Sequence, residues 1–173
     1  PPEMDDFPAW SRLRAASRDF LTPWEPVWAA DDLTRGAFRL RLRRYRQEIA
    51  EDSSYPFFLF RDEDGALLGG LTLGQIRRGV AQTATLGYWM GAAHAGQGHM
   101  SRAVRAAAIF AFNDLRLHRV EAACVPENDA SRRLLERCGF SYEGFARAYL
   151  RINGQWRDHR LYALLESDPI AQA

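Results

Sequence analysis

The sequence has few cysteines, no long apolar run and almost no net charge, and each shortage argues against a class of protein. Its two cysteines, Cys124 and Cys138, are too few for the disulfide framework of a small secreted domain, so we expect a reducing, cytoplasmic location. Nowhere do about 18 apolar residues follow one another, so we expect no membrane span. The 23 basic and 22 acidic residues nearly cancel, which gives no reason to expect direct binding of nucleic acid.

Histidine is also scarce. The four histidines and two cysteines show none of the close spacings that hold a metal ion, so the sequence predicts no metal site. What the chain does have is length and apolar content: 173 residues, 47% of them hydrophobic, are enough to form a core without metals or crosslinks. Since there is no internal repeat and no linker-like segment, residues 1–173 are predicted to form a single domain.

The first half of the chain predicts two helices followed by three antiparallel strands. Apolar residues recur at helical spacing over residues 5–20, and a second helix is expected over residues 33–49 with Asp31 or Asp32 as its cap. Between the helices, two prolines flank Trp24 and Glu25, which predicts a stiff loop. Aromatic and apolar runs separated by turn residues predict the strands, which are expected over residues 55–61, 66–76 and 84–90.

The second half changes to a strand–loop–helix–strand pattern and ends in a hairpin. A glycine-containing loop over residues 92–100 precedes a helix to about residue 115, and a buried strand is expected over residues 119–125. A short helix then begins near Asn128 and ends at Gly139. The hairpin signal Asn153-Gly154 joins strands expected over residues 142–152 and 156–165. The predicted fold class is α+β, with a mixed and mostly antiparallel sheet.

The loop Gly96-Gln97-Gly98 lies between a strand and a helix, which is the arrangement of an anion site. Glycines let the backbone approach an anion, and the unpaired N–H groups of the first helical turn donate to it. No Gly-Lys-Ser/Thr follows, which argues against a nucleoside triphosphate, and Ser101 stands where a dinucleotide fingerprint has its third glycine. The pyrophosphate of a longer thiol cofactor remains possible, and so does an ordinary glycine-containing loop.

Two further features allow more than one interpretation when taken alone. Gly87, inside the strand before this loop, indicates either a bulge with close approach of a ligand or room for a neighbouring aromatic side chain. Asn128 and Ser131, at the start of a helix, are either simple caps or an amide and a hydroxyl offered to a ligand between two separated strands.

Together and in this order, the motifs resemble those of the GNAT acetyltransferases. The segment Gly96-Gln97-Gly98-His99-Met100 with its helix is similar to motif A of that family, and Asn128-x-x-Ser131 with Cys138-Gly139-Phe140 is similar to motif B. A narrower resemblance, to the RimJ and RimL type of ribosomal-protein-alanine N-acetyltransferase, is carried by residues 21–26, 118–120, 143–146 and 153–159. The similarity extends from about residue 4 to residue 166.

The resemblance implies a GNAT fold, with helices flanking a twisted sheet in which a separated pair of central strands holds acetyl-CoA, and no metal. It implies transfer of an acetyl group to a primary amine, namely the N-terminal α-amine of a protein such as a ribosomal protein, by a monomer or homodimer. The catalytic residues expected from it are Ser131, which would protonate the leaving thiolate, and Asn128, which would bind the cofactor arm. The residues themselves add Glu25, which either orients the incoming amine or forms a surface ion pair, and Glu121 and Asp158 are alternative carboxylates. The residues expected to bind acetyl-CoA are Gly87, Tyr88, Trp89, Met90, Ala95, Gly96, Gln97, Gly98, His99, Met100, Ser101, Asn128, Ser131 and Arg132. The residues expected to bind the acceptor are Trp24, Glu25, Tyr149 and Trp156.

Departures from the family pattern leave alternatives open. Ala93 stands where the motif opens with Gln or Arg, and Leu135 where many relatives carry a tyrosine as general acid, so a CoA-binding module without activity stays an alternative. A small-molecule amine is the alternative acceptor. Members of the family also begin with a strand before the first helix, and we expect that strand to be missing from this sequence.

Overall fold

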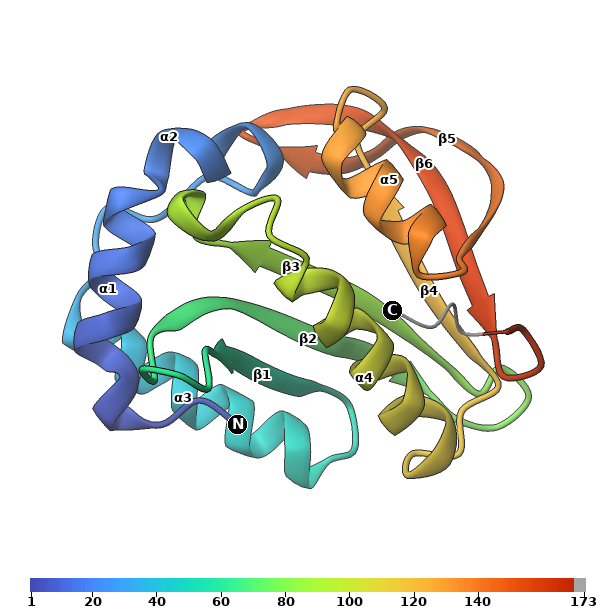
Figure 1. Ribbon diagram of the computed structural model, residues 1–173, viewed down its shortest axis with the longest axis horizontal. Helices are drawn as coiled ribbons and strands as arrows, with labels where there is room; N and C mark the ends of the chain where they lie inside the picture. Colours follow the sequence, from blue (N-terminus) through green and yellow to red (C-terminus); the bar gives the residue numbers. More distant parts are fainter. Residues whose placement is uncertain (170–173) are drawn as a thin grey trace.

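The computed structural model describes residues 1–169 and arranges helices around one six-stranded sheet (Figure 1). The strands are β1 (Tyr55–Phe60), β2 (Leu67–Arg77), β3 (Thr83–Met90), β4 (Arg119–Cys124), β5 (Ser141–Ile152) and β6 (Gln155–Leu165). The α-helices are α1 (Phe7–Ala16), α2 (Arg18–Leu21), α3 (Arg35–Ala50), α4 (His99–Asn113) and α5 (Asp129–Arg137). Single 3-10 turns are η1 (Met4–Asp6), η2 (Thr22–Trp24) and η3 (Ala92–His94). Within residues 1–169, the structure has no helix long and apolar enough to cross a membrane.

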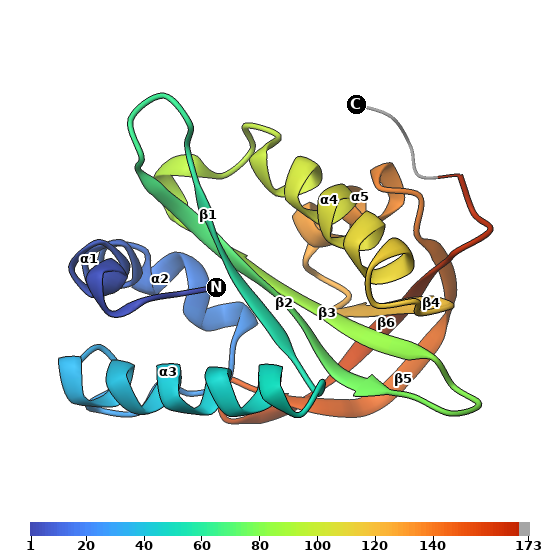
Figure 2. The same ribbon diagram turned by 90° about the horizontal axis from the view of Figure 1, so that it is seen from below.

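The sheet has the strand order β1-β2-β3-β4-β6-β5, and among its neighbouring strands the pair β3–β4 runs parallel while the others are antiparallel. Figure 2 shows the twisted sheet with α4 and α5 on one face and α1, α2 and α3 on the other. Each face has its own apolar core: α4 buries Val104 and Ala111 against the sheet, and Trp10 packs on Phe38 beneath the opposite face. The predicted α+β class with a mostly antiparallel sheet is therefore confirmed.

The parallel pair β3–β4 is short. Thr83, Ala84 and Thr85 pair with Arg119, Val120 and Glu121, after which the two strands separate. β3 nevertheless continues to Met90, and it stays paired with β2 along its other edge. Its last five residues therefore have no strand beside them on the β4 side within the described part of the chain.

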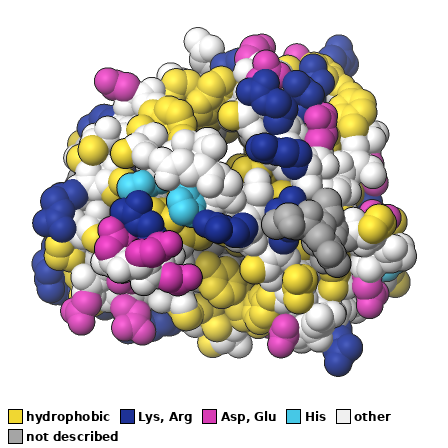
Figure 3. Space-filling view, in the orientation of Figure 1, with side chains coloured by type: hydrophobic (Ala, Val, Ile, Leu, Met, Phe, Trp, Pro, Cys, Tyr) yellow, Lys and Arg dark blue, Asp and Glu magenta, His cyan; other side chains and the backbone are white. Residues whose placement is uncertain are grey.

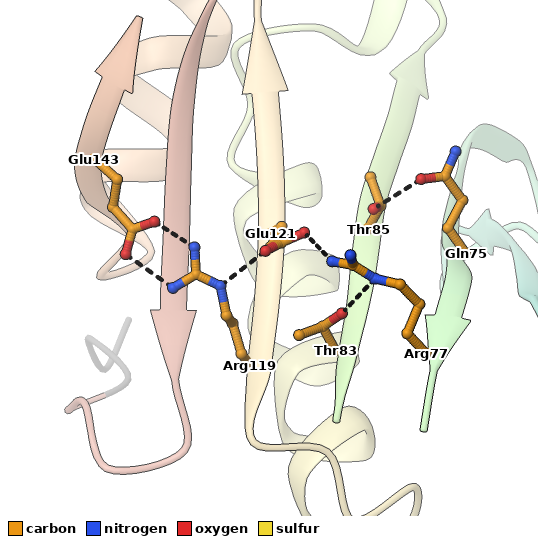
Figure 4. A network of polar contacts seen from close by, with 7 residues as sticks. All are labelled: Gln75, Arg77, Thr83, Thr85, Arg119, Glu121 and Glu143. Carbon is orange, nitrogen blue, oxygen red and sulfur yellow. Dashed lines mark hydrogen bonds and ion pairs between the residues drawn. The ribbon is translucent and has the colours of Figure 1, made fainter. Parts of the chain in front are cut away.

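Polar contacts connect the strands at the end where β3 and β4 still pair (Figure 4). Glu121 on β4 accepts hydrogen bonds from Arg77 on β2 (3.0 Å) and from Arg119 on its own strand (2.9 Å). Arg119 also reaches across β6 to Glu143 on β5, and this pairing lowers the pKa of Glu143 below its usual value. Single exposed ion pairs contribute little, but a connected series across several strands fixes their register at this end.

The N-terminal helices differ in detail from the prediction. The single helix expected over residues 5–20 is broken at Ser17, whose buried hydroxyl accepts a hydrogen bond from the backbone N–H of Ala92 (3.0 Å). The cap of α3 is Thr34, not Asp31 or Asp32, because the Thr34 hydroxyl accepts from the N–H of Ala37 (3.2 Å) while Asp32 pairs with Arg41. The predicted cap Asn128, the stop at Gly139 and the Asn153-Gly154 turn are confirmed.

The bulge considered at Gly87 is absent. Gly87 pairs directly with Thr72, and the register between β2 and β3 is unbroken from Gly69 to Gly74. A Cβ added at Gly87 would meet nothing within 4 Å, so this glycine does not make room for a neighbouring aromatic side chain either. The free edge of β3 results from the divergence of β4, not from a defect within β3.

Gly69, by contrast, has no room for a side chain. A Cβ at this position would lie 2.3 Å from the carbonyl oxygen of Trp89 and 3.1 Å from the Cα of Met90, and both are backbone atoms. We expect Gly69→Ala to lower the free energy of unfolding by about 1–3 kcal/mol, because the end of β3 must move. Urea denaturation followed by circular dichroism measures the change. Gly87→Ala, on the paired strand, is the matched control and should lose no stability; equal losses in both variants would contradict this account of the packing.

Candidate active site

Where β3 leaves β4, the structure opens into a cavity of about 590 Å³. Its wall comes from four parts of the chain: the segment from α2 to Glu25, the end of β3, the loop and first turn of α4, and α5. The residues predicted to bind the cofactor from Tyr88 to Met90 and from Ala95 to Ser101 all line it, as do Asn128 and Ser131. Figure 3 shows basic side chains gathered over α5, beside the gap that separates it from α4.

The loop before α4 has the geometry of an anion cradle. Gly96 and Gly98 have φ values of +76° and +81°, a region that favours glycine, and a Cβ at either position would meet nothing within 4 Å. Gly98 is the residue before the first turn of α4, whose initial N–H groups have no partner within the helix. The cradle therefore presents backbone donors and the positive end of the α4 dipole to one side of the cavity.

Basic side chains add to this cradle, although not the one that was predicted. Arg133 and Arg137 of α5 line the cavity. Arg132 lies outside it and pairs with Asp129 (3.2 Å) and Glu136 (3.0 Å) on its own helix. Arg132 and its neighbour Arg133 point about 100° apart on the helix, so Arg133 faces the cavity and the assignment of Arg132 to the cofactor stays a prediction.

Two hydroxyl groups meet at the separated strands. The Tyr88 hydroxyl on β3 and the Ser131 hydroxyl in the first turn of α5 are 2.5 Å apart, which is the distance of a strong hydrogen bond. Burial raises the pKa of Tyr88 above its usual value, so its phenol stays protonated. Asn128 positions the serine, since its side-chain oxygen accepts from the Ser131 N–H (3.0 Å). The two hydroxyl groups thus form a neutral hydrogen-bonded pair at the cavity wall.

A second cavity, of about 360 Å³, borders the same segment of β3. Glu25, Tyr88 and Trp89 line both cavities, so the two spaces meet at these residues. Glu25 accepts three hydrogen bonds of 2.7 Å: two from the terminal nitrogens of Arg14 and one from the indole N–H of Trp28. The carboxylate expected to act on the acceptor is thus held at the junction by a bidentate ion pair.

Comparison with known proteins identifies the chain. Its residues 1–141 match the family model described as the acetyltransferase (GNAT) domain. It belongs to the GNAT acetyltransferase family. A curated relative named Probable N-acetyltransferase YjcK, from Bacillus subtilis, is 40% identical over 168 residues, or 97% of this chain and 93% of the relative. The [ribosomal protein uS5]-alanine N-acetyltransferase of Escherichia coli is 36% identical over 167 residues, or 95% of this chain and 86% of the relative.

Solved structures agree with this assignment. The structure of Mycobacterium smegmatis RimJ in complex with CoA-disulfide has a TM-score of 0.90 and 34% identity, covering 96% of this chain and 80% of that one. The ribosomal-protein-S5-alanine acetyltransferase from Vibrio fischeri has a TM-score of 0.90 and 27% identity, covering 99% and 93%. The GNAT fold, the resemblance to the RimJ type and the prediction of an acyltransferase are therefore confirmed.

The geometry of this GNAT acetyltransferase separates the predicted acceptor residues into two groups. Trp24 and Glu25 line the first cavity, whereas Tyr149 and Trp156 line neither cavity, so their assignment to the acceptor site stays a prediction. Tyr149 packs beside His159, and Trp156 is 66% exposed on the hairpin strand β6. Gly87 belongs to the second cavity and not to the first. Among residues 1–169, no group of three His, Cys, Asp or Glu side chains could hold a metal ion.

Proposed function

We propose that the chain transfers the acetyl group of acetyl-CoA to the N-terminal α-amine of a protein, with ribosomal proteins as the acceptor class. The relatives support this acceptor, because the Escherichia coli protein is named as an alanine N-acetyltransferase of ribosomal protein uS5. The observation that carries the proposal is the meeting of two cavities at Glu25, Tyr88 and Trp89, one with an anion cradle and one without. Donor and acceptor would enter from opposite sides of β3.

The residues of the first cavity fit acetyl-CoA. The backbone N–H groups from Gly96 to Ser101 and the guanidinium groups of Arg133 and Arg137 would hold its pyrophosphate. The free edge of β3 from Gly87 to Met90 offers backbone groups to its extended arm. When bound, acetyl-CoA supplies an acetyl group activated as a thioester. Everything else in the reaction must come from the chain and from the acceptor amine.

Ser131 and Tyr88 would provide the proton that the leaving thiol requires. The Ser131 hydroxyl would donate its proton to the leaving thiolate, and the Tyr88 hydroxyl would pass a proton to Ser131 through the 2.5 Å contact. The proton that the amine loses on acetylation would return to Tyr88 through water. Asn128 keeps the serine in place through the helix cap. Leu135 stands where many relatives carry a tyrosine that acts as general acid. Its side chain is fully buried in the core and lines neither cavity, so in this chain the proton would come from another hydroxyl group.

The second cavity favours an N-terminal acceptor over a polycationic small molecule. Its charged side chains are paired, Glu25 with Arg14 and Asp32 with Arg41, so it carries no excess of negative charge. A free α-amine has a pKa of about 7.7–8.0, and roughly a tenth of it is neutral at pH 7, whereas a lysine amine is almost entirely charged. An α-amine therefore reacts without a dedicated base, which agrees with the engagement of Glu25 by Arg14.

We expect Gly98→Ala to weaken CoA binding about tenfold or more, because the strained loop moves the backbone donors away from the phosphates. Gly79→Ala is the matched control: Gly79 also has a positive φ (+65°) and open space around a Cβ, but it lies in a turn that lines neither cavity. Both variants should lose about 1 kcal/mol of stability. Isothermal calorimetry with CoA separates them, and equal affinities would contradict the assignment of the cradle.

We expect Ser131→Ala to lower kcat about 100-fold and Tyr88→Phe to lower it about tenfold, with CoA affinity within about threefold of the wild type. The difference arises because the serine stands closer to the leaving group and the tyrosine acts through it. Steady-state kinetics with a peptide that begins with alanine gives both values. Tyr142→Phe, an exposed tyrosine outside both cavities, is the control. A Ser131→Ala enzyme as fast as the wild type would remove the serine from the mechanism.

We expect kcat/KM for such a peptide to rise about tenfold per pH unit up to the pKa of its α-amine, about 7.7–8.0, and to level off above it. The direction follows because the neutral amine is the nucleophile and its fraction stops increasing above that pKa. Initial rates between pH 6 and pH 10 test this. A profile that still rises between pH 9 and pH 10 would indicate a lysine acceptor and contradict the proposed function.

A further inference from the structure

The guanidinium of Arg14 is held by more contacts than its ion pair with Glu25 alone. Arg14 lies on α1, and only 9% of its side chain is exposed. Its guanidinium carbon is 4.1 Å from the centre of the Trp28 ring and 4.9 Å from that of Trp89, and Glu25 accepts from both of its terminal nitrogens. Two aromatic rings and one carboxylate therefore determine both the position and the orientation of this group.

Much of the hydrogen-bonding capacity of Arg14 is unused. A guanidinium carries five N–H donors, and the two bonds to Glu25 use two of them. Among the described residues, the buried Nε of Arg14 has no acceptor at all. Buried donors without partners are costly and uncommon, and this one belongs to a side chain that lines the second cavity. Nε itself is closed to solvent, so a ligand in that cavity would accept from the remaining N–H groups of the two terminal nitrogens.

Glu25 and Arg14 together present an acceptor and donors side by side. The β5–β6 hairpin supports the loop that carries Glu25: the backbone carbonyl oxygen of Glu25 accepts a hydrogen bond from the N–H of Asn153 at the tip of the hairpin (2.8 Å). The first residue of a peptide offers the complementary pair, an α-amine and a carbonyl oxygen separated by one carbon. A lysine side chain offers an amine with no carbonyl within reach of the same two groups.

We propose that Arg14 binds the acceptor by donating a hydrogen bond to the carbonyl oxygen of its first residue, while Glu25 contacts the α-amine. This inference rests on the proposed function and narrows it: the acceptor is an amine with a carbonyl on the neighbouring carbon, the N-terminal residue of a peptide. Arg14 is thus a substrate-binding residue that distinguishes an N-terminus from other primary amines.

The test compares two peptides and two proteins. One peptide begins with alanine; the other is identical except that a trans alkene replaces its first amide, which keeps the shape and removes the carbonyl oxygen. The proteins are the wild type and Arg14→Lys, which keeps a positive charge beside Glu25 but loses the planar set of donors. Arg12→Lys, on the exposed side of the same helix, is the matched control. Peptide affinity for the CoA-loaded protein is measured by calorimetry, and kcat/KM is measured in parallel.

We expect Arg14→Lys to weaken binding and kcat/KM for the amide peptide about 10- to 100-fold, the range for a hydrogen bond to a charged group, and to change the alkene peptide less than threefold. For each peptide, the value for the wild type is divided by the value for Arg14→Lys, which cancels the difference between the pKa values of the two peptide amines. Equal losses with both peptides would overturn the inference, because Arg14 would then act only by holding Glu25.

Two further results complete the test. If Arg14→Lys does not fold, the wild type alone provides the test. Once each affinity is corrected for the fraction of neutral amine in that peptide, the wild type should bind the amide peptide about 10- to 100-fold more tightly than the alkene peptide. Equal affinities would overturn the inference. A CoA-loaded wild type that neither binds nor acetylates either peptide would overturn the proposed function itself, and the inference with it.

Discussion

β3 and β4 pair through three residues on each strand and then separate, and the position of that separation determines where both cavities lie. At the paired end, Glu121 connects Arg77 on β2 with Arg119 on β4, so the strands cannot shift relative to one another without breaking these contacts. At the open end, Tyr88 packs against the apolar core and its hydroxyl meets that of Ser131 on α5. A site for two ligands thus follows from a sheet that is fixed at one end and open at the other.

Both polar pairs at this opening are locally neutral, and this has an energetic reason. Burying an unpaired charge costs several kcal/mol, but the Glu25 carboxylate is neutralised locally by a bidentate guanidinium, and the two hydrogen-bonded hydroxyl groups carry no charge. The Arg14–Glu25 pair contributes mainly to the uniqueness of the arrangement, since buried ion pairs add little net stability. The site is therefore preorganised by contacts that fix orientation, as transfer of an acetyl group between two bound molecules requires.

The features that sequence analysis predicted correctly are those fixed by local chemistry. Asn128 caps α5, Gly139 takes a left-handed conformation after it, and Asn153-Gly154 forms the hairpin turn, because each depends on residues a few positions away. The Tyr88–Ser131 contact joins residues 43 positions apart, and it required the relative placement of a strand and a helix. The Arg14–Glu25 pair was missed because it depends on the break at Ser17, which the helical pattern of residues 5–20 conceals. Tyr149 and Trp156 were assigned to the acceptor site because they are aromatic and near the hairpin turn, and neither of them lines either cavity.

The two halves of the site also differ in how strongly they depend on particular side chains. The donor side is built largely from backbone: left-handed glycines, the first turn of α4 and the edge of β3, which tolerate change in most side chains around them. The acceptor side is built from side chains of α1 and of the loop around Glu25, and that loop is supported by the hairpin through Asn153. Substitution in these segments would alter the acceptor while leaving the donor cradle intact, because loops on a rigid sheet vary without changing the fold. With the roles proposed for Arg14 and Glu25, the arrangement around them is where the identity of the substrate would be determined.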